Sequence, residues 1–137
     1  MTDQPDNQQG VVPIVALCAS AGGLDAFQAF FTAMPTDTGM AFIVVQHQHQ
    51  DQESILASII QRRTSIPVVP ITDEMTIQPD RIHVLPSSYD LTVWNGQFQL
   101  SPLERSKGWP DTIDRYLQSL ANDQGQHVAA IILSGVG

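Results

Sequence analysis

The chain has a single cysteine, Cys18, and few charged residues for its length. One cysteine excludes an internal disulfide, and its position inside the apolar run 11–19 indicates a small buried residue rather than a reactive thiol. Charged residues make up 15% of the 137 residues, whereas 42% are hydrophobic. This composition excludes a disordered chain and predicts a globular domain, and the lack of disulfides is consistent with a reducing compartment.

Basic residues are also scarce, because six lysines and arginines stand against 14 acidic residues, for a formal net charge of -8. Such a surface repels phosphate backbones and anionic lipid, so we expect no nucleic-acid partner. Residues 1–10 have no basic start and no apolar stretch, and they predict a short disordered lead-in rather than a signal peptide. No apolar run is long enough to span a membrane, so we expect a cytoplasmic protein without membrane insertion.

Apolar runs at 11–19, 41–46 and 128–133 predict strands that are buried on both faces. The first two runs enclose a helix signal, so they form a βαβ unit with parallel strands and a right-handed crossover. Shorter strands are predicted at 66–71 and 81–85. Between 91–94 and 97–100, the Asn95-Gly96 pair favours a type I′ turn and predicts a hairpin.

Three amphipathic segments predict helices, at 24–34, 51–63 and 111–122. Pro35 ends the first helix. The second has Ile55, Leu56, Ile59 and Ile60 on one face, and Asp51 is its expected cap, with Ser54 in the first turn. Asp114 is expected in the first turn of the third helix, where the helix dipole favours a carboxylate.

These elements predict an α/β fold with three layers, in which a doubly wound and mainly parallel sheet carries an antiparallel hairpin insert. In open parallel sheets, ligand chemistry gathers at the carboxyl ends of the strands. Because the sequence stops just after the strand at 128–133, we expect a domain over 11–137 that is incomplete at its C-terminus.

Ser20 begins the segment Ser20-Ala-Gly-Gly23 at a strand-to-helix junction, where a hydroxyl is presented on a sharp turn. The adjoining helix N-terminus has unpaired N–H groups that can bind an oxyanion, which favours a nucleophile. Two other interpretations remain open, a plain helix N-cap and a phosphate-cradling loop. The usual Gly-x-Ser-x-Gly elbow of hydrolases does not match.

His47 follows the second buried strand and can lie beside Ser20 at the end of the neighbouring strand, where it would act as a general base. His49 is two positions further on, but two histidines without a third ligand are weak support for a metal site. His83 and His127 are expected to be structural or solvated. Sequence reasoning thus finds a Ser–His pair.

A triad also needs a carboxylate that orients the imidazole. None of the aspartates that might supply it stands at a strand end with an evident line to His47; they are Asp25, Asp51, Asp90 and Asp114.

Three segments resemble the motifs of CheB-type protein-glutamate methylesterases. The stretch 16–23, Ala-Leu-Cys-Ala-Ser-Ala-Gly-Gly, is similar to their Gly-Ala-Ser-x-Gly-Gly signature, and 42–47 is similar to the strand that delivers their histidine. Residues 132–137 resemble the beginning of their Leu-[Ser/Thr]-Gly-x-Gly-x-Asp-Gly motif. The segments 79–86, 111–114 and 119–121 also look like parts of this family, so the resemblance covers nearly the whole chain from about Val11.

The resemblance implies that Ser20 is the nucleophile and His47 the base, with the backbone N–H groups of Val136 and Ala21 at the oxyanion. The family's aspartate would fall about two positions past Gly137, and losing this role in comparable triads lowers turnover by about 10⁴-fold. We therefore expect this chain to be nearly inactive. The sequence departs from the family pattern at Ala16 and at 48–50, Gln-His-Gln, and the second change puts contacts in the substrate loop in doubt.

The implied reaction is hydrolysis of glutamate γ-methyl esters on the cytoplasmic helices of chemoreceptors, with glutamine deamidation as a second activity and no metal or organic cofactor. Only about ten residues precede the first strand, so the domain order resembles that of the amino-terminal module of a methylesterase–methyltransferase fusion rather than one behind a receiver domain. The alternatives are an amidohydrolase with another substrate, a non-catalytic signalling module and a phosphate-binding α/β domain.

Overall fold

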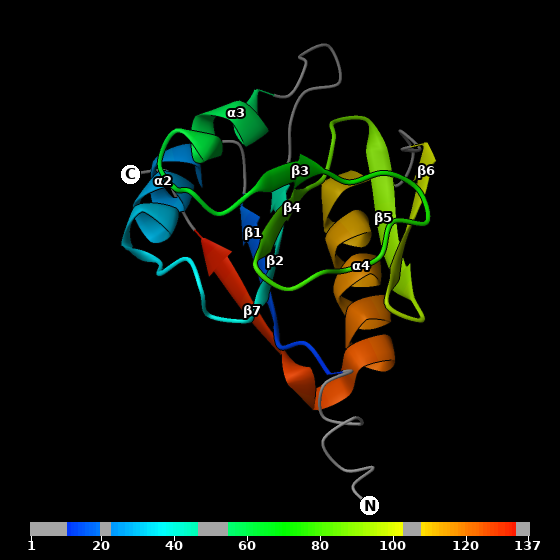
Figure 1. The fold of residues 1–137 in the computed structure, drawn as a ribbon. Coiled ribbons are helices and arrows are strands. Elements are labelled where there is room, and N and C mark those ends of the chain that lie inside the picture. Colours follow the sequence, from blue (N-terminus) through cyan, green and yellow to red (C-terminus); the bar gives the residue numbers. More distant parts are fainter. Residues whose placement is uncertain (1–10, 20–22, 47–54, 103–107, 134–137) are drawn as a thin grey trace, which may run out of the picture.

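The computed structural model describes residues 11–19, 23–46, 55–102 and 108–133, and of 108–112 it describes the backbone alone. These residues form a five-stranded sheet of order β3-β4-β2-β1-β7 and a separate two-stranded hairpin, β5-β6 (Figure 1). All four pairings within the larger sheet are parallel, whereas the hairpin is antiparallel, which confirms the predicted fold class. The strands are β1 (Ile14–Ala19), β2 (Ala41–Gln46), β3 (Val68–Pro70), β4 (Arg81–Val84), β5 (Tyr89–Trp94), β6 (Gln97–Pro102) and β7 (Val128–Leu133).

The sheet is the middle of three layers. Helices α2 (Leu24–Ala33) and α3 (Leu56–Gln61) cover one face, and α4 (Gly108–Gln124) with the hairpin covers the other (Figure 1). The central strand β1 is buried along its whole length. Its side chains alternate, so that Ala16 and Cys18 pack toward α4 and the hairpin while Leu17 and Ala19 pack toward α2 and α3.

Helix α2 buries one stripe of aromatic side chains, as its sequence predicts. Phe27 and Phe31 are fully buried, and the Phe31 ring meets Phe42 of β2 edge to face with centroids 5.5 Å apart. The helix ends at Ala33, just before Pro35, where the pyrrolidine ring excludes a further helical turn.

The hairpin turns at Asn95 and Gly96, whose φ angles are 55° and 75°. Two positive φ angles in a two-residue loop are those of the predicted type I′ turn. Helix α4 holds this turn, because the Asp123 carboxylate accepts hydrogen bonds from the backbone N–H groups of Asn95 at 2.6 Å and Gly96 at 2.8 Å. The hairpin is therefore docked on α4 by hydrogen bonds as well as by its apolar face.

A half-buried ion pair makes a second link between the hairpin and α4. Asp90 of β5 pairs with Arg115 of α4, and its other oxygen accepts a hydrogen bond from the Leu91 N–H. Asp90 is 6% exposed, so its charge is held inside the fold by these two donors. Residues after Gln124 form a short 3-10 turn, η2 (Gly125–His127), which leads into β7.

The expectation that 128–133 is buried on both faces was wrong. The segment is a strand, but β7 is an edge of the sheet, and Ala129, Ala130 and Ile132 are exposed, Ile132 by 65%. Its apolar composition predicts a strand, yet burial depends on a neighbour on each side, and the described part of the chain supplies only β1.

The opposite edge, β3, is built differently. It is short, and Pro70 has no N–H to offer an incoming strand. Ile71 donates to Val84 of β4, so the Val68 N–H points outward, where it donates instead to Gln61 Oε1 at 2.9 Å. The outer edge of β3 is thus closed to strand addition, unlike that of β7, which carries neither proline nor charge.

Several predicted helix boundaries needed correction. Helix α3 begins at Leu56, and Ile55 precedes it with 66% of its surface exposed rather than lying on the buried face. Helix α4 begins at Gly108, three residues earlier than predicted, so Asp114 lies in its second turn and is exposed. The predicted cap Asp51, Ser54 and the lead-in 1–10 lie outside the described residues.

Candidate active site

The carboxyl ends of three neighbouring strands lie level with one another. Ala19 at the end of β1 pairs in register with Gln46 at the end of β2 and with Leu133 at the end of β7. The residues that follow these ends are Ser20, His47 and Ser134. The strands therefore bring the starts of the three predicted functional loops to one edge of the sheet, where open parallel sheets bind ligands.

All four predicted site residues lie outside the described residues: Ser20, Ala21, His47 and Val136. The structure describes the ends of β1 and β2, which directly precede Ser20 and His47. Cys18 of β1 and Val45 of β2 both pack toward α4, and each stands two residues before a predicted catalytic residue.

Gly23 explains one glycine of the Ser20-Ala-Gly-Gly segment. It is the N-cap of α2. The Cβ of any larger residue would lie 2.4 Å from the Ala19 Cβ, too close for two such atoms. Helix α2 thus begins in direct contact with the end of β1, a close approach that glycine allows. The Gly23 cap has no side chain that could accept a hydrogen bond from the first N–H groups of this ten-residue helix, and the helix dipole favours negative charge at this end.

Two of the interpretations that the sequence left open place an anion at this helix N-terminus. An oxyanion and a phosphate both accept hydrogen bonds from N–H groups at the start of a helix. The N-cap of α2 is Gly23, and Ser20, which the third interpretation makes a cap, lies outside the described residues.

Of the four aspartates considered from the sequence, Asp25 lies in the first turn of α2, and Asp51 lies outside the described residues. Asp90 is engaged by Arg115 and Leu91, and Asp114 is exposed on α4. His83 is buried in β4, where its Nδ1 lies 2.7 Å from the Phe42 carbonyl oxygen and its Nε2 accepts from the Gln78 N–H. It is a structural residue, as predicted, and His127 is exposed.

The structure adds two polar groups beneath the strand ends that sequence reasoning did not assign to the site. Tyr116 of α4 is 1% exposed, and its hydroxyl has no hydrogen-bond partner in the described part of the chain. It lies near the Cys18 thiol, whose pKa burial raises to about 11. The spacing of Ile113, Tyr116, Leu117 and Leu120 on one helical face was the signal that could have placed Tyr116 inside.

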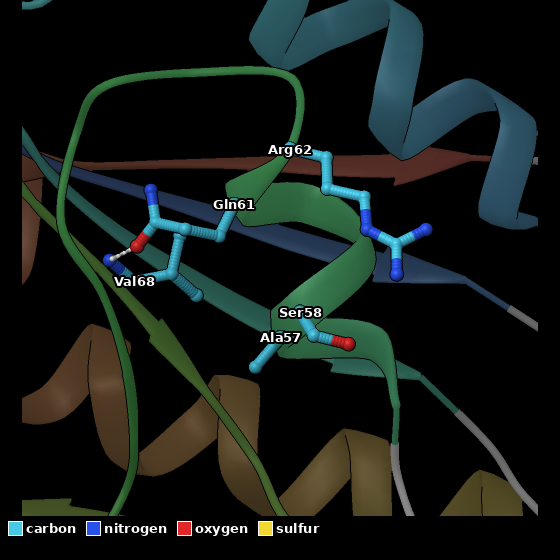
Figure 2. A pocket seen from close by; sticks show the side chains of 5 residues that line it. All are labelled: Ala57, Ser58, Gln61, Arg62 and Val68. Atoms are coloured by element: carbon cyan, nitrogen blue, oxygen red, sulfur yellow. Dashed lines mark hydrogen bonds between the residues drawn. The ribbon is translucent and has the colours of Figure 1, made fainter.

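A pocket of about 370 Å³ opens elsewhere, between α3 and β3. Figure 2 shows its lining, with Gln61 turned toward Val68 and Arg62 extending away from them. Val68 is the first residue of β3, and every strand of the sheet runs in the same direction, so the pocket adjoins the amino ends of the strands. It does not belong to the candidate site.

Two classes of site are not found within the described ranges. Residues 11–19, 23–46, 55–102 and 108–133 contain no group of three or more histidine, cysteine or acidic side chains that could hold a metal ion. Among the helices of this part of the chain, none is long and apolar enough to cross a membrane.

Comparison with known proteins gives a consistent result. A sequence model described as CheB methylesterase matches residues 15–137. The chain is 25% identical to a protein-glutamate methylesterase/protein-glutamine glutaminase of Treponema denticola, over 97% of this chain and 37% of that protein. A protein of the same description from Mesorhizobium japonicum is 29% identical, over 90% of this chain and 37% of that protein. The chain thus spans about a third of the length of these curated relatives.

The fold has a counterpart among solved structures. The crystal structure of the CheB methylesterase catalytic domain of Thermotoga maritima matches with a TM-score of 0.79 and 22% sequence identity. The match covers 92% of this chain and 69% of that one.

Proposed function

Because the chain belongs to the CheB methylesterase family, a family of chemotaxis hydrolases, we propose that it hydrolyses glutamate γ-methyl esters on chemoreceptors, with Ser20 as nucleophile and His47 as base. The observation that carries the proposal is the register of the strand ends. Ala19 and Gln46 are paired, and Ser20 and His47 directly follow them on strands whose neighbouring backbones are within hydrogen-bonding distance.

The proposed reaction forms and breaks an acyl-enzyme. The Ser20 oxygen attacks the ester carbonyl carbon while His47 takes the hydroxyl proton. The tetrahedral oxyanion accepts hydrogen bonds from the backbone N–H groups of Ala21 and Val136. His47 then protonates the leaving methoxide, so methanol departs. Water, deprotonated by His47, attacks the acyl group and releases the glutamate carboxylate and free Ser20.

The same steps would deamidate glutamine, with ammonia as the leaving group in place of methanol. The names of the relatives from Treponema denticola and Mesorhizobium japonicum include both activities. The chemistry needs no metal ion, since the proton moves between side chains and backbone donors hold the oxyanion. We propose that an aspartate orients His47. In the family motif that residues 132–137 resemble, this aspartate would fall about two positions past Gly137.

The first test is covalent. A fluorophosphonate probe reacts with an activated serine, so it should label the full-length protein at Ser20, as located by peptide mass spectrometry. Ser20→Ala should abolish labelling and leave the unfolding transition unchanged. Labelling at another residue, or equal labelling of Ser20→Ala, would show that Ser20 is not the nucleophile.

The second test is turnover. Release of methanol from a methyl-esterified chemoreceptor fragment should fall by about 10⁴-fold or more in Ser20→Ala and in His47→Ala, measured in the full-length protein. A phosphate-binding domain would instead bind inorganic phosphate equally well with and without the Ser20 hydroxyl, because backbone N–H groups carry that interaction.

A further inference from the structure

The Asn95-Gly96 turn combines a favoured hairpin geometry with an intrinsic chemical reactivity. In an Asn-Gly pair, the backbone nitrogen of the glycine can attack the side-chain amide of the asparagine, because glycine has no Cβ that would shield its nitrogen. Asn95 is exposed, and a Cβ built on Gly96 would meet no atom within 4 Å, so the two groups have room to approach each other. The dipeptide that forms this type I′ turn is therefore also a possible site of spontaneous deamidation.

The reaction needs no reagent other than water. The Gly96 nitrogen gives up its proton and bonds to Cγ of Asn95, the Cγ–Nδ2 bond breaks, and Nδ2 takes up a proton and leaves as ammonia. The product is a succinimide ring that contains the Gly96 nitrogen. Water then hydrolyses either of the C–N bonds within the ring, which leaves aspartate or isoaspartate at position 95 and adds a negative charge.

The fold holds the attacking nitrogen in another set of bonds. Asp123 of α4 accepts hydrogen bonds from the Asn95 N–H at 2.6 Å and from the Gly96 N–H at 2.8 Å. The Gly96 carbonyl oxygen accepts a further hydrogen bond from the Ile77 N–H at 2.9 Å. Cyclisation has to break the bond between Gly96 and Asp123, because the same nitrogen must lose its proton and bond to Cγ.

The charge of Asp123 opposes the first step as well. Although burial raises it, the pKa of this carboxyl group is held below its ordinary value by the hydrogen bonds from Gly96, Gln124 and Asn95, so the group is ionised at neutral pH. A negative charge beside the Gly96 nitrogen disfavours the deprotonated form of that nitrogen, since like charges repel. We propose that Asn95 is a site of spontaneous deamidation and that the Asp123 carboxylate controls its rate.

The modification also acts on the contact between the hairpin and α4. Aspartate at position 95 adds a second carboxylate beside that of Asp123, and isoaspartate lengthens the backbone of a two-residue turn. Asn95→Asp reproduces the first product, so it should raise the unfolding equilibrium constant by about 3-fold and have a smaller effect in the Asp123→Asn background. Equal effects in both backgrounds would show that the two carboxylates do not interact, and this part of the proposal would fail.

Peptide mass spectrometry measures the rate of deamidation. The full-length protein is kept folded in mildly alkaline buffer, and the reaction is followed in the tryptic peptide 82–105, in which Asn95 is the only asparagine. The folded chain should react more slowly than the urea-unfolded chain. Asp123→Asn should speed the reaction in the folded protein by about 5-fold, since the rate follows the population of the open turn. Asp114→Asn makes the same change of charge at an exposed position of α4 and should leave the rate as it is.

Three outcomes would overturn the proposal. Equal rates in the folded unmodified chain and in folded Asp123→Asn would show that the carboxylate does not control the reaction. Equal rates in the folded and unfolded unmodified chain would show that the turn gives Asn95 no protection. Gly23→Ala weakens the fold at the start of α2 without touching the turn, so it should not change the rate. An increase as large as that of Asp123→Asn would mean that global unfolding, and not release of the turn, exposes the site.

Discussion

A Cβ atom added to Gly23 would lie 2.4 Å from the Cβ of Ala19, the last residue of β1. Real Cβ atoms do not approach so closely, so one of the two backbones must move when residue 23 is larger than glycine. This contact fixes the start of α2 against the end of β1. Ala19 directly precedes the predicted nucleophile, Ser20.

Gly23→Ala should therefore destabilise the fold by about 1–3 kcal/mol, the usual cost of overpacking a tight contact, measured by urea unfolding. Ala19→Gly removes the opposing Cβ, so the cost of Gly23→Ala should be smaller in the Ala19→Gly background. An equal cost in both backgrounds would mean that the contact with Ala19 is not the cause.

The buried His83 should make stability depend on pH. Burial lowers its pKa more than the hydrogen bond to Phe42 raises it, and Arg81 lowers it further, so the net shift is downward from 6.5. The Phe42 carbonyl can only accept, so Nδ1 carries the proton and Nε2 accepts from Gln78. Protonation of Nε2 would destroy that second bond.

Since the folded-state pKa of His83 is lowered, the unfolded chain binds this proton more readily. The stabilisation is complete above the unfolded pKa of about 6.5 and is lost as the pH falls from there toward the folded pKa. Urea unfolding between pH 7.5 and about pH 5 should show this slope, and His83→Asn should reduce it. His127→Asn, at an exposed histidine, should leave the slope as it is; a slope unchanged in His83→Asn would contradict the assignment.

The Asp123 carboxylate should make the stability of the fold depend on pH in the acidic range. Burial raises its pKa, but the hydrogen bonds from Gly96, Gln124 and Asn95 outweigh this and hold it below 3.8. A lowered carboxyl pKa means stability that is present above the unfolded value and lost as the pH falls through the folded one.

Asp123→Asn should therefore destabilise the chain at neutral pH, by about 1 kcal/mol after solvent screening, and should flatten the pH dependence of unfolding below pH 4. Asp114→Asn changes an exposed aspartate of the same helix and serves as the control. Should both variants behave alike, the clamp on the Asn95-Gly96 turn is not what stabilises the hairpin.

The open edge at β7 should affect self-association. Ile132 is 65% exposed on a strand without proline or charge, the kind of edge that pairs with other chains. Ile132→Lys should lower the concentration-dependent light scattering of the chain with little change in its unfolding midpoint. The neighbouring Ile131 packs against the core cluster on the α2 side, so Ile131→Lys should destabilise the fold instead. If Ile132→Lys leaves the light scattering unchanged, this edge does not mediate contacts between chains.

The strands that lead to the candidate site could be predicted from the sequence, for reasons that are local. The apolar runs before Ser20 and His47 predict buried strands, and a helix between them makes the strands parallel. The pairing of Ala19 with Gln46, which brings the two strand ends level, does not follow from local sequence. It depends on the register of the two strands, which packing on both faces of the sheet decides. Nor does any short motif identify Tyr116 as an unpaired buried hydroxyl.

By itself, the sequence determined the type of most elements: β1 and β2 by continuous apolar runs, the end of α2 by Pro35, and the hairpin turn by Asn95-Gly96. These signals act over a few residues, because they depend on backbone conformation and on the side-chain period. The tertiary structure alone decided that β7 stands at an edge with Ile132 exposed, and that Ile55 points to solvent. Apolar side chains favour burial wherever they occur, but whether a neighbour covers them depends on strand order and layer packing, which arise from contacts far apart in the chain.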